Sequence, residues 1–166
     1  MTTLSHVAVG ILVTRSFINQ GWLPDGTVTP YILGVALANI PDIDGLVSLR
    51  NIRDHHATLK NVTHYPANWF IVFGLVAILA VPFRIHNFYP YVGLAVLNVF
   101  VHFILDTFSI YQGIAWFGPW NKKKYSFIRM LPILPVDTNE WVRWYTKHWV
   151  MYLEIAIWIV TLMVLL

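Results

Sequence analysis

The 166-residue sequence predicts an all-α fold, a polytopic bundle of membrane helices with three clear spans and two shorter N-terminal apolar helices. Hydrophobic residues make up 57% of the chain and charged residues only 11%, whereas a soluble domain has about 25% charged residues. Several apolar runs approach the roughly 20 residues that a membrane-spanning helix needs. Aromatic residues reach 16%, as in proteins with aromatic belts at the membrane surface. We expect one domain, residues 1–166.

The composition also excludes several kinds of chemistry. The chain has no cysteine, which rules out disulfides, thiolate metal sites and thiol catalysis. Its net charge of +3 is modest and is better explained by membrane topology than by nucleic-acid binding. The first residues have no basic segment and no small-residue cleavage site, so we predict no removable signal peptide.

Two short apolar segments open the chain. Residues 4–19 are too short to cross a bilayer comfortably. A second run, residues 31–40, follows a turn region rich in Gly and Pro, and its Gly34 and Ala38 are spaced for close helix packing. The two segments form either short spans or a hairpin that only dips into the bilayer. In both cases Met1 and the region of Asp42 lie on the same side.

Three later segments, residues 67–83, 88–111 and 148–166, are predicted to span the membrane. These crossings put the loops 49–65 and 112–147 on one side, together with nine of the eleven Lys and Arg residues. Cytoplasmic loops carry such an excess of positive charge. We therefore expect a multi-pass protein of the inner (cytoplasmic) membrane, with its basic loops in the cytoplasm.

A polar stripe interrupts the otherwise apolar segment 88–111. His102 and Asp106 are four residues apart, so they share one face of a helix, and Asn98 and Ser109 extend that face. Ionisable groups in a membrane-length helix are costly and usually face a bundle interior or a wet cavity. A satisfied packing contact between helices is the simpler explanation of the stripe taken alone.

Other His and Asp residues converge on the same layer in the predicted topology. His6 begins the first helix, Asp42 and Asp44 end the second, and the adjoining loop contains further histidines, His55, His56 and His64. Clustered His and Asp without Cys suit a hard or borderline divalent ion such as Zn, Mn or Mg, or a pair of ions. As simpler alternatives, Asp44 is a helix cap and the loop histidines are solvated. Glu154 would lie about two turns below this layer, and its role is open.

These residues form five short motifs in a fixed order. The motifs are Ser5-His6, Ala38-Asn39-Ile40-Pro41-Asp42-Ile43-Asp44, Asp54-His55-His56, Thr63-His64 and His102-x-x-x-Asp106-Thr107. Over residues 4–120 the chain resembles the YdjM-type inner-membrane proteins, a family described as membrane-bound metal-dependent hydrolases. The order is more loosely similar to zinc-dependent phospholipase C and single-strand nucleases, which implies phosphoester chemistry. The family more often has Arg after the loop His and Ser after Thr-His, where this chain has His56 and Tyr65, and whether His55 or His56 is the ligand stays open.

The leading functional hypothesis is a membrane-embedded metal-dependent hydrolase. It would cleave a phosphoester or phosphodiester in a lipid or lipid-linked substrate at the cytoplasmic leaflet. The expected cofactor is a divalent metal, Zn before Mn or Mg, with one ion or more. The candidate ligands are His6, Asp42, Asp44, His55, His56, His64, His102 and Asp106. Asp44 and His64 are the candidate catalytic residues, with Asp44 taking the proton of the attacking water.

Two alternatives come from other functional classes. One is a non-catalytic membrane protein whose metal has a structural or regulatory role, which a closed coordination sphere would favour. The other is a proton- or ion-coupled transporter that uses the same intramembrane acids and histidines. Arg50, Arg53 and the run Lys122–Lys124 could hold a phosphate, although the positive-inside rule is the favoured explanation of that run.

Overall fold

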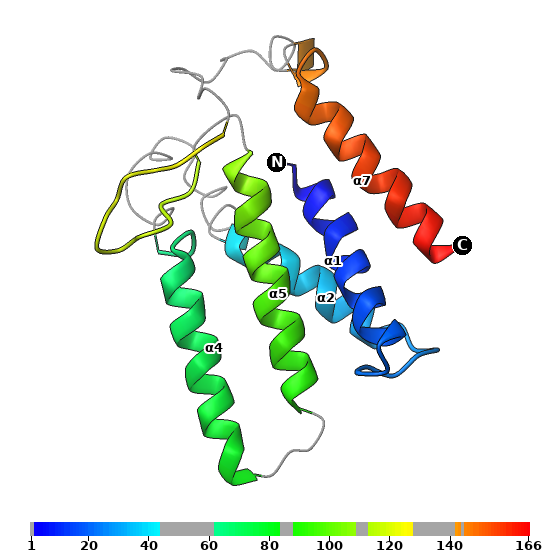
Figure 1. Ribbon diagram of the computed structural model, residues 1–166, viewed down its shortest axis with the longest axis vertical. Coiled ribbons are helices and arrows are strands. Elements are labelled where there is room, and N and C mark those ends of the chain that lie inside the picture. Colours follow the sequence, from blue (N-terminus) through cyan, green and yellow to red (C-terminus); the bar gives the residue numbers. More distant parts are fainter. Residues whose placement is uncertain (1, 44–61, 84–87, 109–112, 128–141, 144) are drawn as a thin grey trace.

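The computed structural model describes residues 2–43, 62–83, 88–108, 113–127, 142–143 and 145–166. Its elements, in chain order, are α1 (Thr3–Asn19), α2 (Thr29–Asn39), η1 (Ile40–Asp42), α4 (Pro66–Ala80), η2 (Val81–Phe83), α5 (Phe88–Thr107) and α7 (Trp149–Leu165). In these residues the only β-type pairing is an isolated bridge between Ile114 and Tyr125. The all-α prediction is therefore confirmed for the described part of the chain (Figure 1).

Two helices, not three, are long and apolar enough to cross a membrane in the described part of the chain. They are residues 66–83, formed by α4 and η2, and α5. The prediction of a third clear span was wrong because α7 has only 17 residues, about 26 Å at 1.5 Å per residue. His148 has an extended backbone and its Nδ1 accepts a hydrogen bond from the Val150 N–H, so the helix begins at Trp149.

The helices α1 and α2 pack closely through small residues, as predicted. A Cβ atom added to Gly10 would lie 3.0 Å from the Cβ of Ala38, and one added to Gly34 would collide with the Thr14 hydroxyl. The 11 residues of α2 rise about 17 Å, which is too short for a hydrocarbon core of about 30 Å. The second arm of the hairpin therefore does not cross a bilayer by itself, and it ends in a tight 3-10 turn, η1.

The helix α5 lies at the centre of the molecule and packs against α1, α2 and α4, while α7 packs against α1. Figure 1 shows the start of α1, the end of α5 and the start of α7 toward the same end of the molecule. The outward faces of α4 and α7 are apolar and exposed, with side chains that include Phe70, Ile71, Leu75, Ile78, Leu79, Ile155, Ile159, Leu162 and Met163. Extended apolar surfaces of this kind mark protein or membrane contacts.

Candidate metal centre

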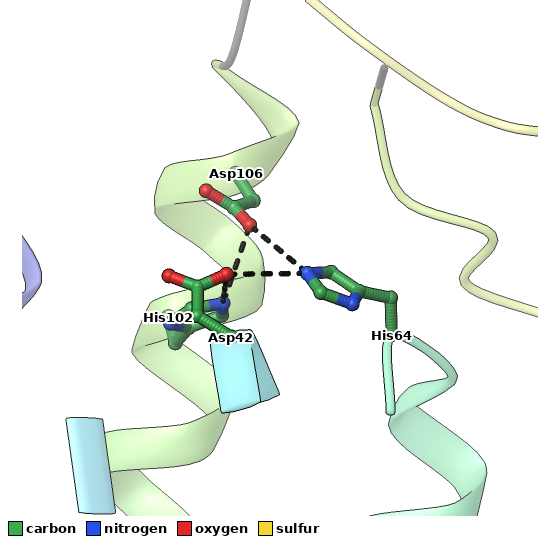
Figure 2. Close-up of side chains that lie close together, drawn as sticks. All are labelled: Asp42, His64, His102 and Asp106. Carbon is green, nitrogen blue, oxygen red and sulfur yellow. Dashed lines mark ion pairs between the residues drawn. The ribbon is translucent and has the colours of Figure 1, made fainter. Parts of the chain in front are cut away.

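Four side chains from three parts of the chain meet beside α5. Asp42 ends η1, His64 lies just before α4, and His102 and Asp106 project from α5. One ligand atom of each residue lies within 4.8 Å of the ligand atoms of the other three. Figure 2 shows the two carboxylates and the two imidazoles facing a common centre. We call these four residues the His/Asp cluster.

The contacts in the cluster alternate between oxygen and nitrogen. The Oδ2 atom of Asp106 lies 3.2 Å from Nε2 of His102 and 3.9 Å from Nε2 of His64. The Oδ1 atom of Asp42 lies 3.4 Å from Nε2 of His64 and 3.7 Å from Nε2 of His102. Local geometry explains this convergence, because His102 and Asp106 are one helical turn apart and η1 turns Asp42 toward α5.

A backbone carbonyl sets the tautomer of the neutral His102 ring. Its Nδ1 lies 2.8 Å from the carbonyl oxygen of Ala38, which can only accept, so Nδ1 carries the proton. In the neutral imidazole, Nε2 then has a lone pair directed at the cluster. This atom is fully buried and has no hydrogen-bond partner among the described residues. A lone pair facing two carboxylate oxygens is repulsive, and either a proton on Nε2 or a cation bound between the groups relieves this repulsion. A histidine whose other ring nitrogen donates to a backbone carbonyl is typical of metal ligands.

The cluster is closed on one side and open on the other. The side chain of His102 is 0% exposed, that of His64 is 23% exposed and that of Asp42 is 36% exposed. The cluster is therefore in contact with solvent at Asp42 and His64, while His102 on α5 is covered. Burial raises the pKa of Asp42, but the hydrogen bond with His64 is the largest opposing cause, and this pKa is held below its ordinary value.

His6 lies next to the cluster but is not one of the four. Its Nε2 atom is 3.2 Å from Oδ1 of Asp106, the carboxylate oxygen that faces away from the other histidines. Its ring stacks on that of His102 with a centroid separation of 4.0 Å. The side chain is 1% exposed. In this position His6 orients Asp106 and is a candidate ligand only for an ion on the Oδ1 side.

The structure thus brings together four of the eight predicted ligands and places a fifth, His6, beside them. Asp44, His55 and His56 lie outside the described residues. Asn98 does not extend the polar stripe to the cluster, because its amide donates to the carbonyl of Leu94 in its own helix.

Sequence reasoning missed the groups that orient the imidazoles. One is the backbone carbonyl of Ala38, which contacts His102; a backbone carbonyl leaves no signal in the sequence because every residue has one. The other is the hydroxyl of Thr63, which lies 3.2 Å from Nδ1 of His64. A Thr directly before a ligand His could have indicated this second contact. Such outer contacts fix the ring orientation and raise the affinity for metal.

A comparison with protein families matches the whole chain, residues 1–166, to the family described as YdjM inner membrane protein. The chain belongs to the YdjM inner membrane protein family. The match extends beyond residue 120, where the motifs end, and so includes α7 and Glu154. Comparisons with curated proteins and with solved structures gave no match. The looser similarity to phospholipase C and nucleases is therefore not supported by a relative.

In this YdjM family member the His/Asp cluster can hold a divalent cation. It offers two imidazole nitrogens and two carboxylate oxygens around one point, a set that suits zinc and other borderline or hard ions. The buried Nε2 of His102 is the atom that most clearly needs such a partner. The site therefore fits a metal on the chemistry of its own residues.

Proposed function

We propose that this chain is a membrane-embedded metal-dependent hydrolase that cleaves a phosphoester or phosphodiester bond in a lipid-like substrate. The observation that carries the proposal is the position of His102 Nε2, which lies 3.2 Å from Asp106 Oδ2 and 3.7 Å from Asp42 Oδ1 while Nδ1 meets the carbonyl of Ala38, in a cluster with one half-exposed carboxylate. A catalytic metal site keeps a coordination position for water or substrate, and the exposed side of this cluster provides room for one.

The roles of the residues follow from their positions. Asp42, His64, His102 and Asp106 would hold the ion, for which zinc is the first choice and Mn or Mg are alternatives. The ion would supply Lewis acidity, which acidifies a water molecule and polarises a phosphoryl oxygen. His6 would keep Asp106 in place through Oδ1. We propose Asp44 as the acceptor of the water's proton. His64, the second candidate, would take this role only in place of holding the ion.

The proposed placement is a multi-pass protein, folded as one domain over residues 1–166, with the cluster at the cytoplasmic interface. The candidate spans α4 with η2 and α5, the exposed apolar faces of α4 and α7 and the family of inner membrane proteins support it. The exposed lysines of residues 122–124, which follow α5 in the chain, support the cytoplasmic orientation.

The test is metal content and hydrolysis measured on the same purified full-length protein. We expect about one or more equivalents of zinc by elemental analysis and metal-dependent hydrolysis of bis(4-nitrophenyl) phosphate or of phosphatidylglycerol in mixed micelles. Asp106→Asn should lose both properties. Glu154→Gln, which changes a buried acid outside the cluster, should keep both. Protein without bound metal, or hydrolysis unaffected by Asp106→Asn, would contradict the proposal.

A structural metal site is the second candidate, and one observation favours it. The cluster already supplies four ligand atoms, which is the number in a closed tetrahedral zinc site. A bound metal whose first shell contains no exchangeable water, together with no hydrolysis of either probe, would support this alternative. Transport is not proposed, because the four side chains form one group and do not follow one another across the membrane.

A further inference from the structure

Residues 113–127, called here the basic loop, fold back onto the end of α5. Ile114 and Tyr125 exchange two backbone hydrogen bonds of 2.9 and 2.8 Å that hold the two arms of the loop together. The positive φ of Gly113, 57°, starts the turn, and a Cβ atom there would collide with the carbonyl of Tyr125. The loop is therefore a defined structure with its own internal contacts.

Three hydrogen bonds attach the basic loop to Thr107, the last residue of α5. The Phe127 N–H and the Ser126 hydroxyl both donate to the Thr107 carbonyl, at 2.9 and 3.2 Å, and the Trp116 indole donates to the Thr107 hydroxyl at 3.1 Å. Thr107 directly follows Asp106 of the His/Asp cluster. The loop is thus fixed to the turn of α5 that carries one of the cluster carboxylates.

The surface of the loop combines exposed aromatic rings with a run of lysines. Phe117, Trp120 and Phe127 are between 60% and 78% exposed, and Lys122–Lys124 are exposed as well. Residues 113–127 contain no Asp or Glu, so the loop presents only positive charge. Exposed aromatics at the end of a candidate span are placed to enter a membrane interface, and clustered lysines beside them attract anionic lipids.

We propose that the basic loop is a binding surface for the headgroup of an anionic phospholipid. Charge complementarity selects this occupant, since a phosphate without a balancing ammonium group attracts the lysines more strongly than a zwitterionic headgroup does. The attachment to the end of α5 keeps the surface at the membrane boundary. The proposal rests on the membrane placement proposed above and deepens the proposed function, because it names an anionic phospholipid as the lipid brought to the cluster.

The positive-inside rule alone would also place lysines on this side, and a matched pair of variants separates the two explanations. Arg143 and Lys147 are exposed cations that precede α7 and lie outside the loop. The variants K122Q/K123Q and R143Q/K147Q each remove two positive charges. Lys124 is left unchanged because it has a further contact. If general surface charge explained lipid binding, both variants would lose the same amount of affinity for the anionic lipid.

The experiment measures binding of fluorescent phosphatidylglycerol and phosphatidylcholine to the full-length protein in neutral detergent, after EDTA treatment. Each lysine near an anionic surface contributes about fivefold, so K122Q/K123Q should lose roughly ten- to thirtyfold in affinity for phosphatidylglycerol. R143Q/K147Q should stay within about twofold, and high salt should remove most of the preference. Trp120→Ala should weaken the binding of phosphatidylglycerol and of phosphatidylcholine by the same factor. Circular dichroism and gel filtration establish that each variant is folded.

Equal affinity of the wild type for the two lipids, or equal losses in the two double variants, would overturn the proposal. The EDTA treatment makes lipid binding independent of the metal and of hydrolysis. Failure of lipid binding with intact metal content would therefore contradict only the lipid surface, whereas missing metal with intact lipid preference would contradict only the metal-dependent function.

Discussion

Two buried acids in apolar helices of this protein have opposite surroundings. Glu154 of α7 is 7% exposed and Asp106 of α5 is 14% exposed. The carboxylate of Glu154 faces donors only. It accepts the Thr2 N–H at 2.9 Å, the Thr2 hydroxyl at 2.5 Å and a hydrogen bond from Tyr145. Burial, followed by this contact with Glu154, raises the pKa of Tyr145, so its hydroxyl keeps its proton and remains a donor.

Asp106 instead faces imidazoles. Its Oδ1 meets His6, and its Oδ2 meets His102 and His64. An imidazole nitrogen offers either a proton or a lone pair, and the Ala38 carbonyl directs the lone pair of the neutral His102 ring toward the cluster. Burial of an acid therefore does not by itself mark a functional site. Asp106 differs from Glu154 in having partners that can also bind a cation.

The largest expected effect comes from changing the two acids to their neutral amides. Asp106→Asn should lower zinc affinity at least about 100-fold, because a ligand charge is lost at the centre. Glu154→Gln should leave zinc affinity within about threefold, because its partners belong to a separate contact. Competition with a zinc-binding dye on folded, detergent-solubilised protein measures both. Similar losses in the two variants would remove the distinction between the acids.

Truncation of Glu154 should act on stability alone. Glu154→Ala leaves the partly buried Thr2 and Tyr145 groups without their acceptor, which should cost about 2 kcal/mol and lower the melting temperature by about 4–8 °C. Thermal unfolding followed by circular dichroism checks this, with zinc affinity measured below the transition. An unchanged melting temperature would show that Glu154 is not satisfied by the start of α1.

Thr63→Val should weaken the metal site through His64. The hydroxyl that lies beside His64 Nδ1 is lost, and loss of such an outer contact typically costs about tenfold in metal affinity. Thr161→Val is the matched control, because the hydroxyl of Thr161 donates within α7 to the carbonyl of Ile157. Zinc competition on both variants is the measurement, and equal affinities would indicate that Thr63 does not orient His64.

The smallest effect is expected for Thr2→Val. This change removes one donor to Glu154 but keeps the backbone N–H contact, so about 1 kcal/mol of stability should be lost. The melting temperature should fall by about 2–4 °C, and the zinc affinity should not change. A loss as large as that of Glu154→Ala would mean that the hydroxyl alone satisfies the carboxylate.

Local periodicity was enough to predict one half of the cluster. The spacing of His102 and Asp106 fixes a common helix face, and Gly34 with Ala38 indicates the close packing that lets α2 carry Asp42 toward α5. The start of α7 was less predictable, because hydropathy did not show that His148 caps the helix. The predicted span, residues 148–166, was therefore longer than the helix itself.

Contacts between distant residues were harder to predict than the elements themselves. His6, Asp42 and His64 were grouped with Asp106 only through topology and motif order, and the exact side of Asp106 that His6 faces depends on helix rotation. The pairing of Glu154 with Thr2, 152 residues away, left no pattern in the sequence. Neither did the carbonyl of Ala38, which decides the tautomer of His102.

Binding of a metal through Nε2 of His102 is the property on which the proposed function of the His/Asp cluster depends. X-ray absorption spectroscopy of zinc-loaded full-length protein measures the ligands of the metal. We expect a shell of about two imidazole nitrogens at about 2.0–2.1 Å with carboxylate oxygen and an exchangeable water, and an imidazole signal reduced to that of one ring, from His64, in His102→Ala. A zinc shell without imidazole, or one unchanged in His102→Ala, would contradict binding through His102.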